Sequence, residues 1–179
     1  MFKAKRSATL SLITIICGAY LADQLYPQFY EYTALYGPLV QSGEYWRLFS
    51  VALVHGGLTH LFFNMFSLLV LGNPVEEALG KARFLVIFFI SLLTGSLASI
   101  YLNSTPHVSV GASGAVFGLF GAFIAMRKMI SEGVRDIYVI VGLNFIFGFV
   151  LGGVDWRAHL GGLVGGYLTT ALLLRITRL

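Results

Sequence analysis

The chain has 179 residues and a formal net charge of +4, and 57% of its residues are apolar while only 11% are charged. This composition, with a mean hydropathy of +0.81, excludes an ordinary soluble globular domain and indicates a membrane protein. The basic residues lie in short links between apolar runs instead of in one patch, which argues against a nucleic-acid partner.

Six apolar runs predict an all-α polytopic membrane protein that forms a single domain over residues 1–179. The predicted spans cover about residues 8–25, 58–72, 84–102, 113–126, 137–151 and 158–174. The basic start before the first run is also typical of a signal peptide. This run is long enough to span a membrane and lacks a convincing cleavage site, so we expect a retained first helix.

The segment between the first two spans, residues 26–57, is too interrupted to cross a membrane because it contains Pro27 and Pro38. Its aromatic run from Tyr45 to Phe49 is nevertheless unlike a plain loop. Tyr and Trp favour the membrane–water boundary. We therefore expect an interfacial segment that lies partly in the lipid surface.

The distribution of Lys and Arg predicts the orientation of the bundle. With the N-terminus inside, only Arg47 and Arg157 lie on the outer side. The basic residues on the inner side are Lys3, Lys5, Arg6, Lys81, Arg83, Arg127, Lys128, Arg135, Arg175 and Arg178. We therefore expect an N-in/C-in bundle with both termini in the cytoplasm.

In this topology four polar side chains from three spans lie at a similar depth below the outer surface. His60 and Asn64 lie in the first turns of the second span, Ser113 opens the fourth, and His159 opens the sixth. Each has an ordinary explanation by itself, as a helix cap, an interhelical hydrogen bond or a boundary histidine. Polar and ionisable groups at one depth in a membrane point instead to a functional site.

The chemistry that fits these groups is acyl transfer. Ser113 needs a base to become a nucleophile, and burial keeps His159 neutral and able to accept its proton. The oxyanion would be bound by the Ser113 backbone N–H, the Asn64 amide and an imidazole N–H of His60. His60 and Asn64 share one helix face because they are four residues apart.

Glycines are expected to bring the nucleophile and the base together. Gly111 and Gly114 remove side chains beside Ser113, and Gly162 lies on the helix face of His159, where small residues permit close packing in lipid. Phe117, one turn after Ser113, is placed to pack flat on the imidazole. Asp155 is expected to be a solvated loop residue, which leaves a dyad instead of a triad.

These residues resemble the rhomboid family of intramembrane serine proteases, in its minimal six-helix prokaryotic form. The matching motifs, in the family's order, are Trp46-Arg47, His60-Leu61-Phe62-Phe63-Asn64, Gly111-Ala112-Ser113-Gly114-Ala115-Val116-Phe117-Gly118 and Ala158-His159-Leu160-Gly161-Gly162. The resemblance implies a Ser113–His159 dyad, an oxyanion hole from His60, Asn64 and the Ser113 N–H, and membrane-spanning protein substrates. It also implies a site facing the extracytoplasmic side of the plasma (inner) membrane.

The chain departs from some rhomboid proteases at Phe117, where others carry tyrosine. Stacking on His159 survives that change, whereas a role for a phenol hydroxyl does not. The resemblance assigns His55 a structural role only, and it gives none to Pro106 and His107.

Other classes fit less well. The chain has no His-Glu-x-x-His motif, no aspartate central to a predicted span, and only one cysteine, Cys17, so we expect no metal or cofactor. A small transporter would show internal repeats or paired broken helices. The remaining alternative is a rhomboid-like protein that binds membrane clients without proteolytic turnover, although such proteins lack the serine or the histidine.

Overall fold

The computed structural model describes residues 7–127 and 154–177, and most of them are helical. Four helices are long and apolar enough to cross a membrane within this part of the chain: α1 (Ala8–Leu25), α5 (Leu58–Leu79), α6 (Lys81–Leu102) and α9 (Trp156–Thr177). A shorter apolar helix, α7, covers Ser113–Met126. The predicted first and fourth spans have the bounds of α1 and α7. The predicted span 137–151 lies outside the described residues.

The second helix is longer than its predicted span. The predicted span ended at residue 72, directly before Asn73-Pro74, but α5 continues through Pro74 to Leu79. Proline removes only one helical hydrogen bond, and membrane helices tolerate it where neighbouring helices pack around them. The last turns of α5 also pack in the core, because Val75 and Leu79 are buried. The helix ends at Gly80, whose φ of +83° favours glycine.

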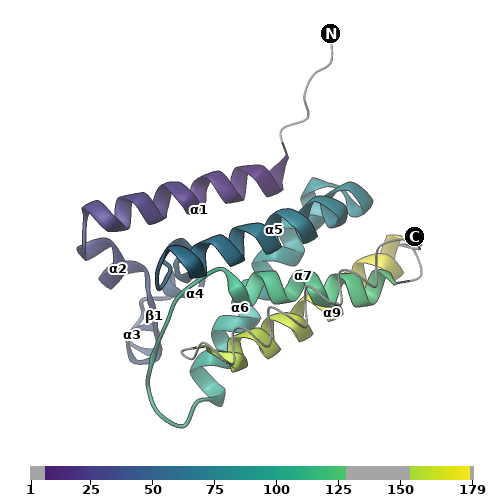
Figure 1. Cartoon of the computed structure of the whole chain (residues 1–179). Coiled ribbons are helices and arrows are strands. Elements are labelled where there is room, and N and C mark those ends of the chain that lie inside the picture. Colours follow the sequence, from purple (N-terminus) through teal and green to yellow (C-terminus); the bar gives the residue numbers. More distant parts are fainter. Residues whose placement is uncertain (1–6, 128–153, 178–179) are drawn as a thin grey trace.

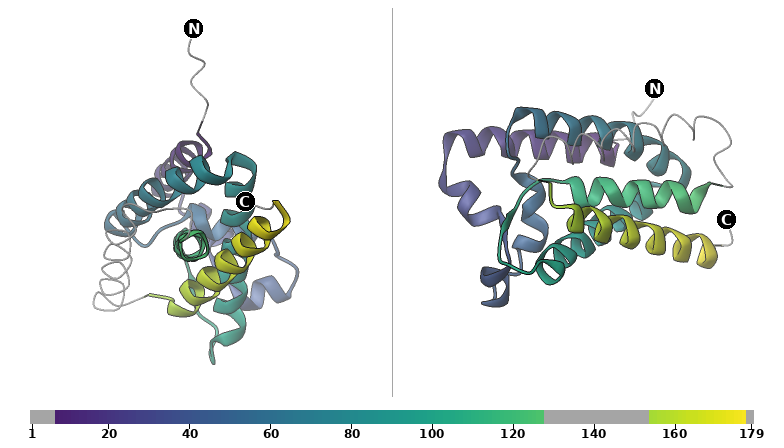
Figure 2. Two further views of the ribbon diagram at one scale, coloured as in Figure 1. Left: turned by 90° about the vertical axis from the view of Figure 1, so that its right-hand side faces the viewer. Right: turned by 60° about the horizontal axis from the view of Figure 1, so that its bottom comes forward.

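The short helix α7 is the centre of the molecule. Figure 2 shows it end-on, with α5, α6 and α9 around it. Its buried residues, from Gly114 to Phe123 and at Met126, occupy all sides of the helix. A helix that is apolar all round is stable only when other elements cover it, or when it is surrounded by lipid. Figure 1 shows α5, α7 and α9 beginning at one end of the bundle, while α1 begins and α9 ends towards the other.

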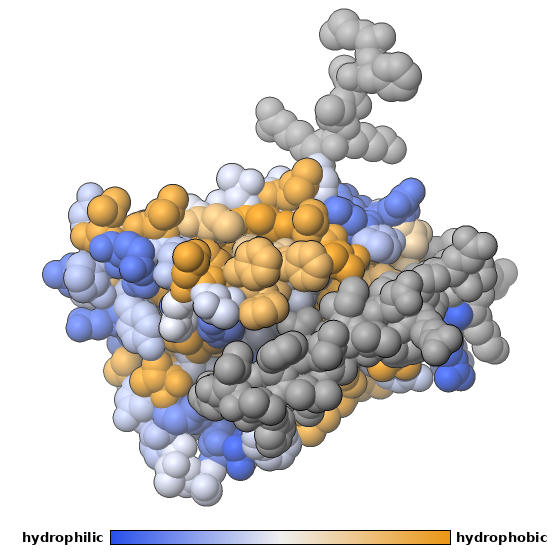
Figure 3. Space-filling view, in the orientation of Figure 1, coloured by the Kyte–Doolittle hydropathy of each residue, from blue (hydrophilic) through white to orange (hydrophobic). Residues whose placement is uncertain are grey.

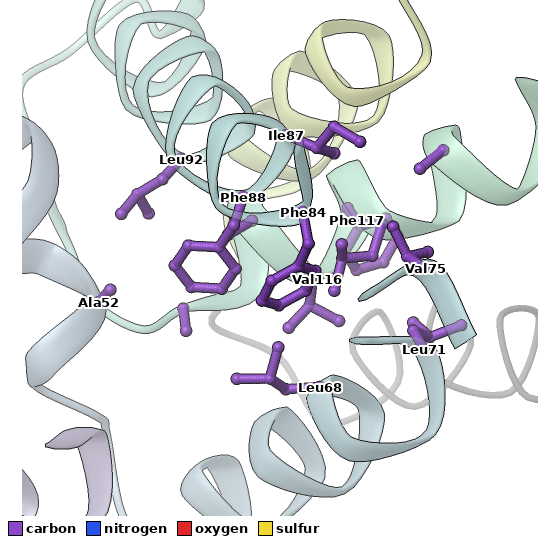
Figure 4. Close-up of a cluster of buried hydrophobic side chains, with 14 of the residues drawn as sticks. Ala52, Leu68, Leu71, Val75, Phe84, Ile87, Phe88, Leu92, Val116 and Phe117 are labelled. Carbon is purple, nitrogen blue, oxygen red and sulfur yellow. The ribbon is translucent and has the colours of Figure 1, made fainter. Parts of the chain in front are cut away.

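Aromatic and branched side chains fill the space between α5, α6 and α7. Phe84 and Phe88 of α6 pack with Leu68 of α5 and Val116 of α7 in this core, and each is at least 96% buried (Figure 4). Apolar residues also form a band on the outside, between hydrophilic groups at the two ends (Figure 3). This distribution fits a multi-pass membrane protein, whose lipid-facing belt is as apolar as its interior.

The predicted interfacial segment is an ordered set of short elements. It contains α2 (Gln28–Thr33), β1 (Leu35–Tyr36), α3 (Gly37–Gln41), α4 (Arg47–Ser50) and the 3-10 turn η1 (Val51–Leu53). The Arg47 guanidinium is 4% exposed, pairs with Glu44 at 2.6 Å and donates to the carbonyls of Glu31 and Ala34 at 2.7 Å each. One buried arginine therefore links Glu44 to two backbone carbonyls and holds the turns of this segment together.

A two-stranded ribbon, which the sequence did not predict, joins this segment to the loop before α7. Strand β1 pairs antiparallel with β2 (Val108–Ser109), with Leu35 opposite Ser109 and Tyr36 opposite Val108. The pairing fixes the path of the chain into Ser113. The loop before the candidate nucleophile is thus held by backbone hydrogen bonds.

Candidate active site

The chain enters α7 through a backbone turn that only glycine suits. Gly111 has a φ of +110°, and a Cβ there would lie 2.7 Å from Cε1 of His60. The Gly111 N–H donates to the Val51 carbonyl at 2.9 Å, and the Ala112 N–H points to Nε2 of His55 at 3.5 Å. Ser113 then begins the helix and is half-buried. The turn therefore places His60 beside the backbone that leads into Ser113.

His60 and Asn64 lie on one face of α5, as their spacing predicts. The Gly56 N–H points to Nδ1 of His60 at 3.4 Å, so the hydrogen of the neutral ring is on Nε2, the nitrogen that lies against Gly111. Asn64 is 5% exposed, and its amide nitrogen donates to the His60 carbonyl at 2.9 Å. That nitrogen keeps a second N–H for another acceptor.

His159 is buried in the first turns of α9, and its ring lies flat on Phe117. The two ring centroids are 4.0 Å apart and the planes differ by 9°, so the stacking expected from the sequence is present. Phe117 lies four residues after Ser113 and therefore on the same side of α7, one turn further along. The imidazole is thus beside the turn of α7 that begins with Ser113.

Glycines bring α7 and α9 into backbone contact along their length. A Cβ on Gly162 would overlap the carbonyl oxygen of Gly114, and a Cβ on Gly166 would overlap that of Gly118. The close packing predicted from small residues is therefore present. Gly118 and Gly166 extend it one turn beyond the contact between Gly114 and Gly162. This contact fixes the register of the helix of His159 against the helix of Ser113.

A small hollow lies at the start of α7. Ser113, Gly111, Gly114 and Ala158 line it. Its other lining residues are Leu35, Val51, Leu92, Ser96, Ser109 and Val110. The hollow therefore joins the start of α7 to the residue before His159.

Asp155 is not the solvated loop residue that we expected. Its Oδ1 accepts from the Ala158 N–H at 3.2 Å, so it caps the start of α9. Its Oδ2 accepts a short hydrogen bond from Ser99 and lies 3.0 Å from Nε2 of His107. The sequence offered a signal, because an aspartate directly before an apolar helical run is a common N-cap.

Electrostatics around the site favour a neutral His55 and a charged Asp155. Burial, together with the nearby His60, lowers the pKa of His55 to about 3. Burial raises the pKa of Asp155, but hydrogen bonds from Ser99, His107 and the Ala158 N–H outweigh it, so that this pKa lies below its usual value. His55 packs edge-to-face on His60 with ring centroids 5.2 Å apart.

Comparison with known proteins identifies the family. A family model described as the Rhomboid domain matches residues 42–176. The chain belongs to the rhomboid family. The match covers every candidate site residue, from His60 to Gly162.

Rhomboid relatives occur in bacteria and plants. The chain is 41% identical over 140 residues to rhomboid protease GluP of Bacillus subtilis (strain 168), which is 75% of this chain and 27% of that protein. It is 36% identical over 138 residues to putative rhomboid protease YdcA of the same bacterium, 74% of this chain and 69% of that protein. It is 41% identical over 151 residues to RHOMBOID-like protein 5 of Arabidopsis thaliana, 79% of this chain and 48% of that protein. The chain thus spans about a quarter of one relative and about half of another.

Two further residues of this rhomboid chain gain a structural account. Arg47, known from the sequence only through the Trp46-Arg47 motif, holds the interfacial segment. His107, for which no role was predicted, contacts Asp155 from the loop before β2. No spacing rule could find the second contact, since the two residues are 48 positions apart.

Proposed function

We propose that this rhomboid protein is an intramembrane serine endopeptidase that cuts membrane-spanning proteins, with Ser113 as nucleophile and His159 as general base. The observation that carries the proposal is the stacked pair of Phe117 and His159. It supports a base beside the first turn of α7, on two helices that glycines hold in backbone contact.

In the first step His159 takes the proton of the Ser113 hydroxyl, and the Ser113 oxygen attacks the scissile carbonyl carbon. The resulting oxyanion accepts hydrogen bonds from the Ser113 backbone N–H, the free N–H of the Asn64 amide and Nε2–H of His60. The tautomer fixed by Gly56 supports this last donor. Such a donor typically contributes about 3–4 kcal/mol to the transition state.

In the second half the protonated His159 gives its proton to the leaving amine, and the acyl group stays on Ser113. Water then attacks the ester, with His159 taking its proton and returning one to the serine oxygen. Gly111 lets His60 approach the backbone before Ser113, and Gly114 lets α6 and α9 pack closely against the backbone after it.

The length of α7 supports a site below the membrane surface. Its 14 residues span about 21 Å, whereas the hydrocarbon core of a bilayer is about 30 Å thick. A start of α7 beneath the headgroups lets water reach Ser113 from one side and a membrane-spanning substrate approach through lipid. With the basic residues inside, the proposal places six spans in the plasma membrane, both termini in the cytoplasm and the site towards the exterior.

The proposal is tested by cleavage of a reporter with one membrane span, using the purified chain in liposomes. We expect Ser113→Ala and His159→Ala each to abolish cleavage without lowering the melting temperature by more than a few degrees. Ser109→Ala, which removes a hydroxyl from the same hollow, should keep at least half of the activity. Undiminished cleavage by Ser113→Ala would rule the mechanism out, and reporter binding without cleavage by the wild type would favour a client-binding protein instead.

A further inference from the structure

The start of α9 is fastened by one carboxylate that contacts three elements. Asp155 Oδ1 accepts from the Ala158 N–H of α9 at 3.2 Å. Oδ2 accepts from Ser99 near the end of α6 and lies 3.0 Å from Nε2 of His107 in the loop before β2. We call Ser99, His107 and Asp155 the outer clamp.

The clamp acts on the turn of the helix that carries His159. The first N–H groups of any helix lack helical partners, and this turn frays when they are not capped. Here the Asp155 side chain accepts a hydrogen bond from the Ala158 N–H, and the Asp155 backbone carbonyl accepts one from the His159 N–H at 3.2 Å. A carboxylate at this end also interacts favourably with the helix dipole.

The same clamp reaches the strand that leads to Ser113. His107 directly precedes β2, from which the chain passes through Gly111 into α7. Further along, α9 is packed backbone-to-backbone on α7, because Gly162 and Gly166 lie against Gly114 and Gly118. The first turn of α9 is therefore the part whose position depends on Asp155.

The clamp is suited to hold a fixed geometry. The Asp155 side chain is 12% exposed and that of His107 is 34% exposed. Asn103 adds to it by donating from its amide to the Ser99 carbonyl at 2.7 Å, and its amide nitrogen lies 3.3 Å from Nε2 of His107. Hydrogen bonds to an ionised carboxylate are stronger than those between neutral groups.

We propose that Asp155 is a positioning residue for the reaction: through the outer clamp it sets His159 at its working distance from Ser113. The proposal rests on the proposed proteolytic function. It differs from a catalytic triad, because Asp155 binds backbone N–H groups of α9 and the residues of two other elements.

The test compares Asp155→Ala with Asp155→Asn in the liposome cleavage assay, measuring kcat and KM separately. Alanine removes the cap, and a small displacement of a reacting group can cost about a hundredfold in rate. We therefore expect Asp155→Ala to lower kcat by about a hundredfold with KM within twofold of wild type. Asparagine caps helices as well as aspartate does. The kcat of Asp155→Asn should therefore be at least tenfold higher than that of Asp155→Ala.

Glu76→Ala is the matched control. Glu76 also accepts hydrogen bonds from the first residues of a helix, Ala8 and Thr9 of α1, but it belongs to the last turns of α5, which lie at the end of the bundle away from the start of α9 (Figure 1). This variant should lower the melting temperature about as much as Asp155→Ala and leave kcat within twofold of wild type. Equal losses of kcat in the two variants would reduce Asp155 to a structural role.

Hydrogen exchange separates the proposal from the proposed function. The amides of Ala158 and His159 should exchange at least tenfold faster in Asp155→Ala than in wild type, and little faster in Asp155→Asn. If wild type cuts the reporter and Asp155→Ala cuts it equally fast, the positioning role is wrong while proteolysis stands. If wild type cuts nothing, proteolysis and the positioning role that rests on it both fail.

Discussion

Two pairs of neighbouring helices are packed in different ways. Between α7 and α9 the contact is backbone on backbone, because a Cβ on Gly162 or Gly166 would overlap a carbonyl oxygen. Between α1 and α5 it is side chain on backbone, since a Cβ on Gly72 would meet Cγ2 of Thr9 at 2.8 Å. A side chain can change rotamer more easily than a packed helix backbone can shift. The pair that carries the candidate nucleophile and base is thus the pair with less freedom.

The largest effect is expected where backbone meets backbone. Gly162→Ala should separate α7 from α9 and lower cleavage at least a hundredfold, with a clear loss of thermal stability measured in detergent. Gly72→Ala should lower cleavage and thermal stability less, because the atoms nearest to Gly72 belong to the side chains of Thr9 and Phe84 and not to a backbone. Gly18→Ala in α1 is the control, since a Cβ there has no atom within 4 Å and alanine favours helix by about 1 kcal/mol. Equal losses at Gly162 and Gly72 would remove the distinction between the pairs.

The next effect concerns the ring that supports His159. Phe117→Ala removes a 97% buried ring and its stacking on the imidazole, so we expect a destabilisation of about 3–5 kcal/mol and a large fall in kcat. Phe117→Tyr keeps the ring and should retain most of the activity. Measurement of unfolding and kcat on both variants checks this; a fully active Phe117→Leu would show that stacking has no part in the reaction.

A smaller effect is expected at the interfacial segment. Arg47→Lys keeps the charge but loses the geometry that reaches Glu44 and two carbonyls at once. We expect a melting temperature several degrees lower and cleavage within fivefold of wild type, because Arg47 supports the segment but does not itself line the hollow at Ser113. A loss of cleavage with no loss of stability would assign Arg47 to the site itself.

The smallest effect is a pH dependence of stability. His55 is neutral in the folded state down to a pKa of about 3, whereas in the unfolded chain it takes up a proton near its ordinary pKa of 6.5. Above pH 6.5 neither state binds this proton, so His55 adds no pH dependence to the free energy of unfolding. Between pH 6.5 and 3 only the unfolded chain binds it, so the free energy of unfolding falls as the pH is lowered. His55→Gln should lose less stability than wild type between pH 7 and 4.5 in thermal unfolding. An identical pH slope in both proteins would contradict a buried neutral His55.

Much of the fold could be predicted because membrane helices follow from local sequence. The bounds of α1 and α7 were predicted from apolar runs alone, and the stacking of Phe117 on His159 followed from helical spacing. The continuation of α5 past Pro74 was not predictable, since it depends on the packing of Val75 and Leu79.

Contacts between distant residues were beyond the reach of the sequence. The β1–β2 ribbon joins short strands with no periodic pattern to reveal them. The clamp on Asp155 combines residues from α6 and a loop, so only the N-cap itself had a local signal. The sequence thus predicts the helices and the kinds of polar group on them, while the groups that hold those helices in register need the structure.

The central claim is that His159 activates Ser113. It is tested most directly by a fluorophosphonate probe, which reacts with activated serines, followed by mass-spectrometric mapping of the labelled peptide. The account predicts labelling at Ser113 in wild type and in Ser109→Ala, and at least a hundredfold slower labelling in His159→Ala. Labelling at another residue, or at Ser113 with equal speed in His159→Ala, would contradict it.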